Sequence, residues 1–175
     1  WWQPSLPEQL DALIASGAMG PAVVVMVDGM TAVGGNQYVD SDAVGPWARH
    51  VTDELVPWAE QTFRLLEGRE HRGVFGKSSG GYGSLMMGLE HAGTFGAIAC
   101  HSGDCYFEYG YLPDFPKAID GLRSCGGLGP FLEKLFQRSW KKVPGSLFPA
   151  INITAMAHFY SANAAAPHGI DLPFD

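Results

Sequence analysis

The sequence predicts an α/β fold in which a doubly wound, mostly parallel sheet carries helices on both faces. Helical and strand-like apolar patterns alternate along the N-terminal part of the chain, and the strand-like runs lack polar alternation. Uninterrupted apolar strands are typical of parallel sheets buried on both faces, and their alternation with helices implies right-handed crossovers. With 175 residues, of which 46% are hydrophobic, the chain can form one domain with a buried core.

The first expected helix begins after Ser5 and ends before Gly17. Ser5 and Glu8 have the spacing of a capping box, in which each side chain satisfies a free N–H group of the first turn. Leucine and isoleucine then recur on one face. Gly17 can take the left-handed conformation that ends helices.

A buried strand is expected next over residues 22–27, because Ala-Val-Val-Val-Met-Val is apolar and rich in β-branched side chains. Residues 28–46 are too polar and too rich in glycine for a core element, and they predict a long functional loop. A helix follows over residues 47–65, with a kink at Pro57, whose ring removes one internal hydrogen bond.

Two short strands are expected on either side of a further helix. The strands cover residues 72–75 and 97–100, and the helix covers residues 80–92. Beyond Asp104 proline and glycine are frequent, and helices are expected only around residues 131–136 and from about 151 to 163.

Three parallel strands are few for this number of helices, and no closing strand follows them. We therefore expect a partial sheet of at least three strands in one domain over residues 1–175. This domain is expected to lack its N-terminal strands and a C-terminal segment.

The most informative motif is Gly76-Lys77-Ser78-Ser79-Gly80, a G-x-S-x-G sequence between an expected strand and an expected helix. Such a strand-turn-helix is a nucleophile elbow, which strains the backbone of the central serine and lifts its hydroxyl above the carboxyl edge of the sheet. Side chains at Gly76 and Gly80 are expected to collide with the neighbouring strand and helix. We predict Ser78 as the nucleophile and the Ser79 N–H as an oxyanion donor.

Two phosphate-binding motifs compete for the same residues, and a chance match is the third alternative. Gly76-Lys77-Ser78 ends like a P-loop, but His71 stands where its first glycine belongs. Gly81-Tyr82-Gly83 lacks the third glycine of a dinucleotide fingerprint, because Met86 takes that position. The position between a strand and a helix favours the catalytic interpretation over chance.

Several motifs together resemble the α/β-hydrolase esterases related to esterase D, S-formylglutathione hydrolase, feruloyl esterases and the mycolyltransferases. They are Gln37-Tyr38-Val39-Asp40-Ser41, Gly45-Pro46-Trp47, Asp53-Glu54-Leu55-Val56-Pro57, the elbow with Gly81-Tyr82-Gly83, and His101-Ser102-Gly103-Asp104. The resemblance implies an α/β-hydrolase fold and a serine hydrolase of small carboxylic esters. In that chemistry Ser78 attacks the carbonyl, a histidine is the base, and an acid orients the histidine.

The resemblance also implies an acid and then a histidine after Ser78, each following a further strand. The sequence shows no such strands, so both groups are expected outside residues 1–175. The second oxyanion donor is expected at or just before Trp1. Pairing of His158 with Asp104 or Asp114 would keep the acid before the base and stays open as an alternative.

The remaining histidines have simpler interpretations. His101 belongs to a turn that is structural in the resembling family, His168 is expected at the surface or at a cap, and His71 and His91 are expected to be solvated. Cys100 and Cys105 could form a local disulfide.

Composition excludes several other classes of function. The formal charge is −7 without a basic cluster, which excludes a nucleic-acid footprint, and no apolar run reaches the roughly 18 residues of a membrane span. No signal-peptide pattern is present, which favours the cytoplasm over export but leaves the compartment open. The three cysteines lack zinc-site spacing, and Asp40 and Asp42 lack the glycine and glutamate of a calcium loop. No metal or cofactor is expected.

Three functional hypotheses follow. The first is a serine esterase that works through an acyl-enzyme on Ser78. The second is an inactive hydrolase-fold module that binds small acyl or aromatic ligands, and the third is an acyltransferase that uses the same serine. Association with the remaining parts of the domain, or with a second copy, is expected.

Overall fold

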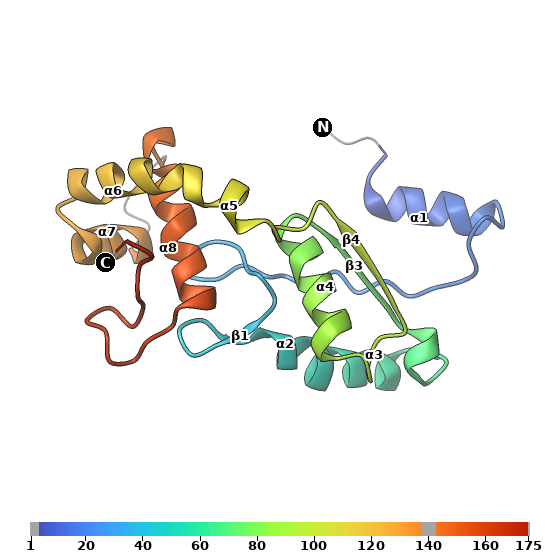
Figure 1. Cartoon of the computed structure of the whole chain (residues 1–175). Helices are drawn as coiled ribbons and strands as arrows, with labels where there is room; N and C mark the ends of the chain where they lie inside the picture. The colour runs from blue at the N-terminus through green and yellow to red at the C-terminus, as the bar shows by residue number, and fades with distance from the viewer. Residues whose placement is uncertain (1–3, 138–142, 175) are drawn as a thin grey trace.

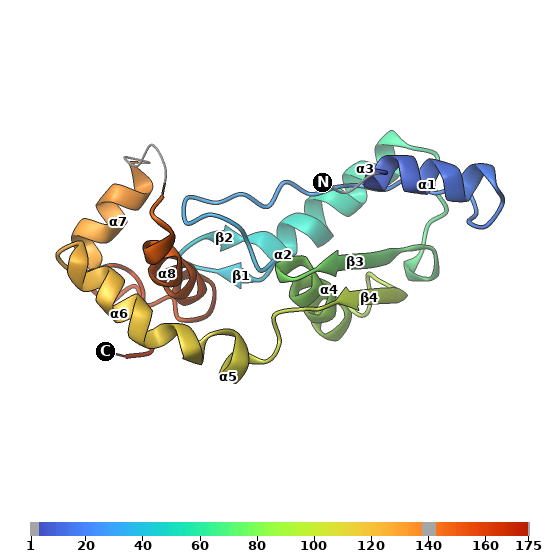
Figure 2. The same cartoon turned by 90° about the horizontal axis from the view of Figure 1, so that it is seen from above.

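The computed structural model describes residues 4–137 and 143–174. The strands β3 and β4 with helix α4 occupy the middle of an elongated molecule. The helices α6, α7 and α8 gather at one end, and α1 lies at the other (Figures 1 and 2).

Helix α1 (Leu6–Ala15) confirms the first expected helix. Glu8 Oε2 accepts hydrogen bonds from the Ser5 N–H at 2.6 Å and from the Ser5 hydroxyl at 2.7 Å. These two bonds lower the pKa of the Glu8 carboxyl. Gly17 has φ +74, as expected for a residue that ends a helix.

The expected strand over residues 22–27 is not part of a sheet. A strand exists through hydrogen bonds with a neighbour, and no described segment pairs with these residues. Val23 and Val25 remain 44% and 39% exposed. A cavity of about 440 Å³ separates this extended segment from the start of β3.

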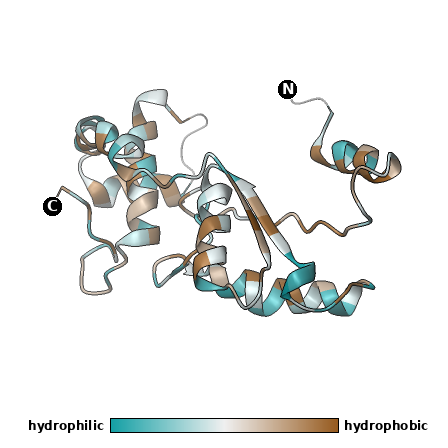
Figure 3. Ribbon diagram, turned by 45° about the vertical axis from the view of Figure 1, so that its right-hand side comes forward, coloured by the Kyte–Doolittle hydropathy of each residue, from teal (hydrophilic) through white to brown (hydrophobic). Residues whose placement is uncertain are grey.

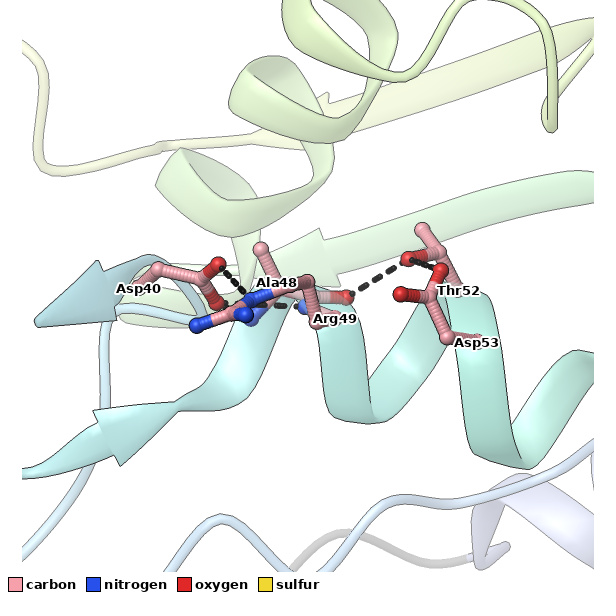
Figure 4. Close-up of polar contacts among 5 residues, drawn as sticks. All are labelled: Asp40, Ala48, Arg49, Thr52 and Asp53. Atoms are coloured by element: carbon pink, nitrogen blue, oxygen red, sulfur yellow. Dashed lines mark hydrogen bonds and ion pairs between the residues drawn. The ribbon is translucent and has the colours of Figure 1, made fainter.

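The loop over residues 28–46 contains a small hairpin of β1 (Asp40–Ser41) and β2 (Gly45–Pro46). Asp40 connects this hairpin to the helix that follows: its carboxylate accepts the N–H groups of Ala48 at 2.9 Å and Arg49 at 3.1 Å (Figure 4). The Arg49 guanidinium adds a bond of 2.7 Å. Burial acts to raise the pKa of Asp40, but these bonds together hold it below its usual value.

The helix expected over residues 47–65 is present as an unbroken helical run over residues 47–62, which consists of three consecutive segments. They are α2 (Trp47–Arg49), the π-helix η1 (His50–Leu55) and α3 (Val56–Thr62). Pro57 follows helical residues of η1 without a break, so its missing N–H removes one hydrogen bond to the preceding turn. The wider π-turn therefore precedes the proline, and the Val56 N–H bonds to the carbonyl of Val51.

The central sheet has two parallel strands, β3 (Gly73–Lys77) and β4 (Ala97–His101), in register from Gly73 opposite Ala97 to Lys77 opposite His101. A short 3₁₀ turn, η2 (Arg69–His71), precedes β3. Helix α4 (Ser79–Glu90) joins the strands and packs against both. The expectation of at least three strands is wrong for the described residues, because the segment over residues 22–27 stays unpaired.

The sheet is covered unevenly. Met87 of α4, Ala48 of α2 and Phe95 form a small buried cluster, with Val74 of β3 packed against it. Every residue of β4 is nonetheless exposed. Hydrophobic residues run along the open strands in Figure 3, and Phe75 and Ile98 are 54% and 43% exposed. The expected helices on both faces are therefore not found around this sheet.

The C-terminal part is a cluster of helices with its own core. After α5 (Phe107–Gly110) and the 3₁₀ turn η3 (Leu112–Asp114) come α6 (Phe115–Ser124), α7 (Leu128–Phe136), the 3₁₀ turn η4 (Gly145–Leu147) and α8 (Phe148–Tyr160). The two helices expected here are confirmed as α7 and α8. The buried core residues are Leu122, Phe131, Leu132, Ala150, Ala157, Ile170 and Leu172.

Helix α6 was not expected, because it carries proline and glycine. Pro116 lies in its first turn, where proline is tolerated. A Cβ at Gly121 would lie 3.1 Å from the Cβ of Ala150. The glycine therefore lets α6 and α8 approach closely. Within the described residues, no helix has the length and apolar character needed to cross a membrane.

Candidate active site

Ser78 forms the turn between β3 and α4, and its backbone has φ 55 and ψ −121. A positive φ is strained for a residue with a side chain. The Ser78 N–H donates to the carbonyl of His101 at 3.0 Å, and its own carbonyl accepts the N–H of Tyr82 at 2.9 Å. The strained conformation that the motif predicts is present, and Ser78 is exposed at the end of the strand.

The two glycines of the motif differ in what surrounds them. A Cβ at Gly76 would overlap the carbonyl group of Gly80, as expected. A Cβ at Gly80 would meet no described atom within 4 Å, so the collision expected there is wrong for the described part of the chain. The reason is that no described strand pairs with the free edge of β3.

The other two strained residues lie against the same helix. Tyr38 (φ 57) and Ser102 (φ 48) are the remaining described residues with a side chain and a positive φ. A Cβ at Gly83 would lie 2.8 Å from the Cβ of Tyr38, so this glycine lets the Tyr38 loop contact α4. Strained backbone therefore gathers around the first turns of α4, a pattern that is typical of functional sites.

The Ser78 hydroxyl donates to a carboxylate. Asp104 Oδ1 accepts the Ser78 Oγ hydrogen at 3.1 Å, and Asp104 Oδ2 accepts the Ser79 hydroxyl at 3.0 Å. The sequence considered Asp104 only as a partner of His158. It missed the contact with Ser78, because Asp104 follows the neighbouring strand and reaches Ser78 only in the folded chain.

Gln37 is a second residue that the sequence did not assign to the site. It is 1% exposed, and its Nε2 lies 3.1 Å from Ser79 Oγ and 3.4 Å from Asp104 Oδ2. No local sequence signal would have found it, because its partners lie 42 and 67 residues further along the chain.

The alternative pair of His158 with Asp104 or Asp114 is not brought together. His158 is buried in α8, where its Nδ1 lies 2.7 Å from the carbonyl of Thr154, and Asp114 accepts a bond from Asn152 at 3.4 Å. His168 lies beside α7, where a Cβ at Gly129 would be 3.0 Å from its ring. Within residues 4–137 and 143–174, the hydrogen bonds of Ser78 Oγ include no histidine.

A cavity of about 620 Å³ opens beside Ser78. Its lining includes Asp28, Met30, Tyr38, Phe75, Ser78 and Ser79. The Ser79 N–H has no acceptor within α4, because the first N–H groups of a helix have none. It lies at the positive end of a 12-residue helix. The second oxyanion donor was expected at or before Trp1, which lies outside the described residues.

Several tyrosines lie near Asp104. Tyr82, Tyr160 and Phe107 form an aromatic cluster, with a Tyr82–Tyr160 ring-centroid distance of 5.5 Å. Burial, together with the charge of Asp104, raises the pKa of Tyr111 to about 12. Burial raises the pKa of Tyr160 as well. These phenols therefore stay neutral at ordinary pH.

The three cysteines are free thiols, so the local disulfide between Cys100 and Cys105 is not formed. Burial and the neighbouring Cys100 raise the pKa of the Cys105 thiol. Among the residues that the structure describes, no three His, Cys, Asp or Glu side chains gather closely enough to hold a metal ion.

Comparison with known proteins shows the family to which this chain belongs. A family model described as "Putative esterase" matches residues 4–147. The chain belongs to this esterase family, for which an α/β-hydrolase fold is expected, and β3, α4 and β4 form a strand-helix-strand part of such a fold.

Two curated relatives are also named as esterases. Esterase Rv1288 of Mycobacterium tuberculosis strain H37Rv and esterase MT1326 of strain CDC 1551 are each 36% identical over 111 residues, which cover 61% of this chain and 24% of each relative. The chain thus spans about a quarter of the curated relatives it matches. A solved structure of a ferulic acid esterase is similar at 26% identity and a TM-score of 0.48, over 55% of this chain and 37% of that one.

Proposed function

We propose that this chain carries the nucleophile of a carboxylic-ester hydrolase, and that Ser78 forms an acyl-enzyme. The observation that carries the proposal is the positive φ of the exposed Ser78, which projects its hydroxyl beside a cavity of about 620 Å³. Membership of the esterase family and the names of the two mycobacterial relatives support ester hydrolysis as the reaction class.

The proposed reaction has two steps. Ser78 Oγ attacks the ester carbonyl while its proton passes to a histidine base, which the intact protein supplies from outside the described residues. The Ser79 N–H stabilises the oxyanion, and one such donor contributes roughly 3 kcal/mol in comparable sites. The alcohol leaves with the proton, and water then hydrolyses the acyl-serine to release the acid.

Covalent labelling tests the nucleophile directly. In the intact protein, a p-nitrophenyl alkylphosphonate should modify Ser78, as located by peptide mass spectrometry. Ser78→Ala should abolish the labelling and lower p-nitrophenyl acetate turnover at least about 1,000-fold. Ser124→Ala, a change of a hydroxyl that bonds only within its own helical end, is the matched control. Unchanged turnover in Ser78→Ala would remove the proposal.

A non-catalytic binding module is the second candidate, and one observation favours it. Within the described residues the Ser78 hydroxyl donates to the Asp104 carboxylate rather than to a histidine. This candidate predicts that the intact protein binds small esters without turnover and without phosphonate labelling. The same experiment therefore separates the two candidates.

A further inference from the structure

We infer that Asp104 is a positioning residue for the Ser78 hydroxyl and that Gln37 holds Asp104 in place. This inference rests on the proposed role of Ser78. The Asp104 carboxylate bridges two adjacent serines, accepting Ser78 Oγ at one oxygen (3.1 Å) and Ser79 Oγ at the other (3.0 Å). A carboxylate fixed at one oxygen restricts the rotation of the hydroxyl bound to its other oxygen.

The backbone that carries Asp104 is pressed against the first turn of α4. A Cβ at Gly81 would lie 2.9 Å from Gly103 Cα, and a Cβ at Gly103 would lie 2.8 Å from the N atom of Tyr82. Only glycine at both positions permits this approach. Ser102, which precedes Gly103, has φ 48, so the turn that ends in Asp104 also contains a strained residue.

Gln37 contacts the same carboxylate oxygen as Ser79. Its buried Nε2 donates toward Asp104 Oδ2 (3.4 Å) and toward Ser79 Oγ (3.1 Å), and it also lies 3.6 Å from Met156 Sδ in α8. The next residue, Tyr38, packs on Gly83 of α4. Three separate segments of the chain therefore meet at this carboxylate, and α8 contacts Gln37 beside it. Such convergence is expected of a preorganised site.

The geometry indicates how Asp104 acts during the reaction. When the base takes the Ser78 proton, the bond from Ser78 to Oδ1 is released. The bonds from Ser79 and Gln37 to Oδ2 keep Asp104 in place, so Ser78 returns to the same rotamer after each turnover. Asp104 thus affects how often Ser78 Oγ is aligned for attack, and it need not affect how tightly the substrate binds.

The test measures phosphonate labelling of Ser78 in the intact protein, with the maximal rate constant kinact separated from the apparent binding constant KI. Asp104→Ala should lower kinact about 10-fold or more, because the Ser78 hydroxyl loses the charge-assisted hydrogen bond that orients it. KI should not change. Asp104→Asn, which is isosteric and keeps one acceptor oxygen, should lower kinact less, and Gln37→Met should lower it least.

Coupling between the two residues distinguishes positioning from a general loss of structure. The double variant Gln37→Met/Asp104→Ala should react no more slowly than Asp104→Ala alone, because Gln37 acts through Asp104. Asp120→Asn, on the exposed side of α6, is the matched charge-removal control. If Asp104→Ala folds poorly, Asp104→Asn still gives the kinact measurement.

The outcomes separate this inference from the proposed function. If wild-type Ser78 is not labelled, the proposed function fails and the positioning role fails with it. If the wild type is labelled and both Asp104 variants react at the wild-type rate or faster, only the positioning role is overturned. If the Gln37 and Asp104 substitutions each lower kinact and their effects add in the double variant, the inference that Gln37 acts through Asp104 is overturned.

Discussion

The two halves of this molecule are stabilised in different ways. In the C-terminal helical cluster, Phe131 and Ala150 are fully buried in a continuous core that joins α6, α7 and α8. In the region of β3, α4 and β4, every residue of β4 is exposed and Phe75 is 54% exposed. The strained Ser78 lies in this open region. Its support comes from close backbone contacts and from the hydrogen bonds of Asp104, and only a small core lies beneath it.

Because of this difference, stability should depend on side-chain volume in the helical cluster and on close backbone contacts around Ser78. The helical cluster resembles an ordinary core, in which lost side-chain volume destabilises the fold. Around Ser78, the contacts at Gly76, Gly81 and Gly103 leave no room for a Cβ. Adding a methyl group at one of these glycines should lower the free energy of unfolding more than removing a methyl group from the neighbouring strand.

The largest expected effect comes from comparing a substitution in the helical core with one on the exposed strand β3. Phe131→Ala should lower the free energy of unfolding by about 3–5 kcal/mol, because it leaves a cavity in a fully buried site. Phe75→Ala should lower it far less, since its side chain is half exposed. Urea unfolding of both variants gives the comparison. Equal losses would mean that further chain or a partner covers β3 in the intact protein.

The sequence predicted those parts of the fold whose causes are local. The turn at Ser78 follows from five consecutive residues, and the start of α1 from the spacing of Ser5 and Glu8, so both were found correctly. Residues 22–27 have the composition of a strand, but pairing depends on a neighbour that their own sequence does not specify. The sequence therefore predicted more strands in the central sheet than the described residues form.

Contacts between distant segments account for the other differences. Helix α6 was missed because Gly121 looks like a helix breaker until α8 packs against it. Asp104 and Gln37 were not assigned to the site, because the hydrogen bond between Ser78 and Asp104 joins residues 26 apart in the sequence and that between Gln37 and Asp104 joins residues 67 apart. Neither spacing nor composition encodes such contacts.

The next prediction compares the two glycines of the motif. Gly76→Ala should lower the free energy of unfolding by about 1–3 kcal/mol, because its methyl group overlaps the Gly80 carbonyl and the backbone must shift. Gly80→Ala should be neutral or stabilise the fold by about 0.5 kcal/mol, since alanine favours the helix and its methyl group meets no described atom within 4 Å. Chemical denaturation measures both changes. A large loss in Gly80→Ala would place further chain beside α4.

The smallest expected effect concerns Asp40, which connects the β1–β2 hairpin to α2 (Figure 4). Asp40→Ala should lower the free energy of unfolding by about 1 kcal/mol, as for other lost N-terminal caps, and the exposed ion pair with Arg49 adds little. The folded-state pKa of Asp40 lies below its unfolded value of 3.8. Its contribution is therefore present above that value and is lost as the pH falls through the folded-state pKa.

The pH dependence of stability distinguishes the contribution of the negative charge of Asp40 from that of its hydrogen-bonding geometry. The stability of the wild type should decrease relative to Asp40→Asn when the pH is lowered below about 4, because only the wild type loses a carboxylate there. Above that pH the difference between the two proteins should be constant. Thermal unfolding across this pH range measures the difference, and a difference that does not change with pH would show that the hydrogen bonds of Asp40 do not require its charge.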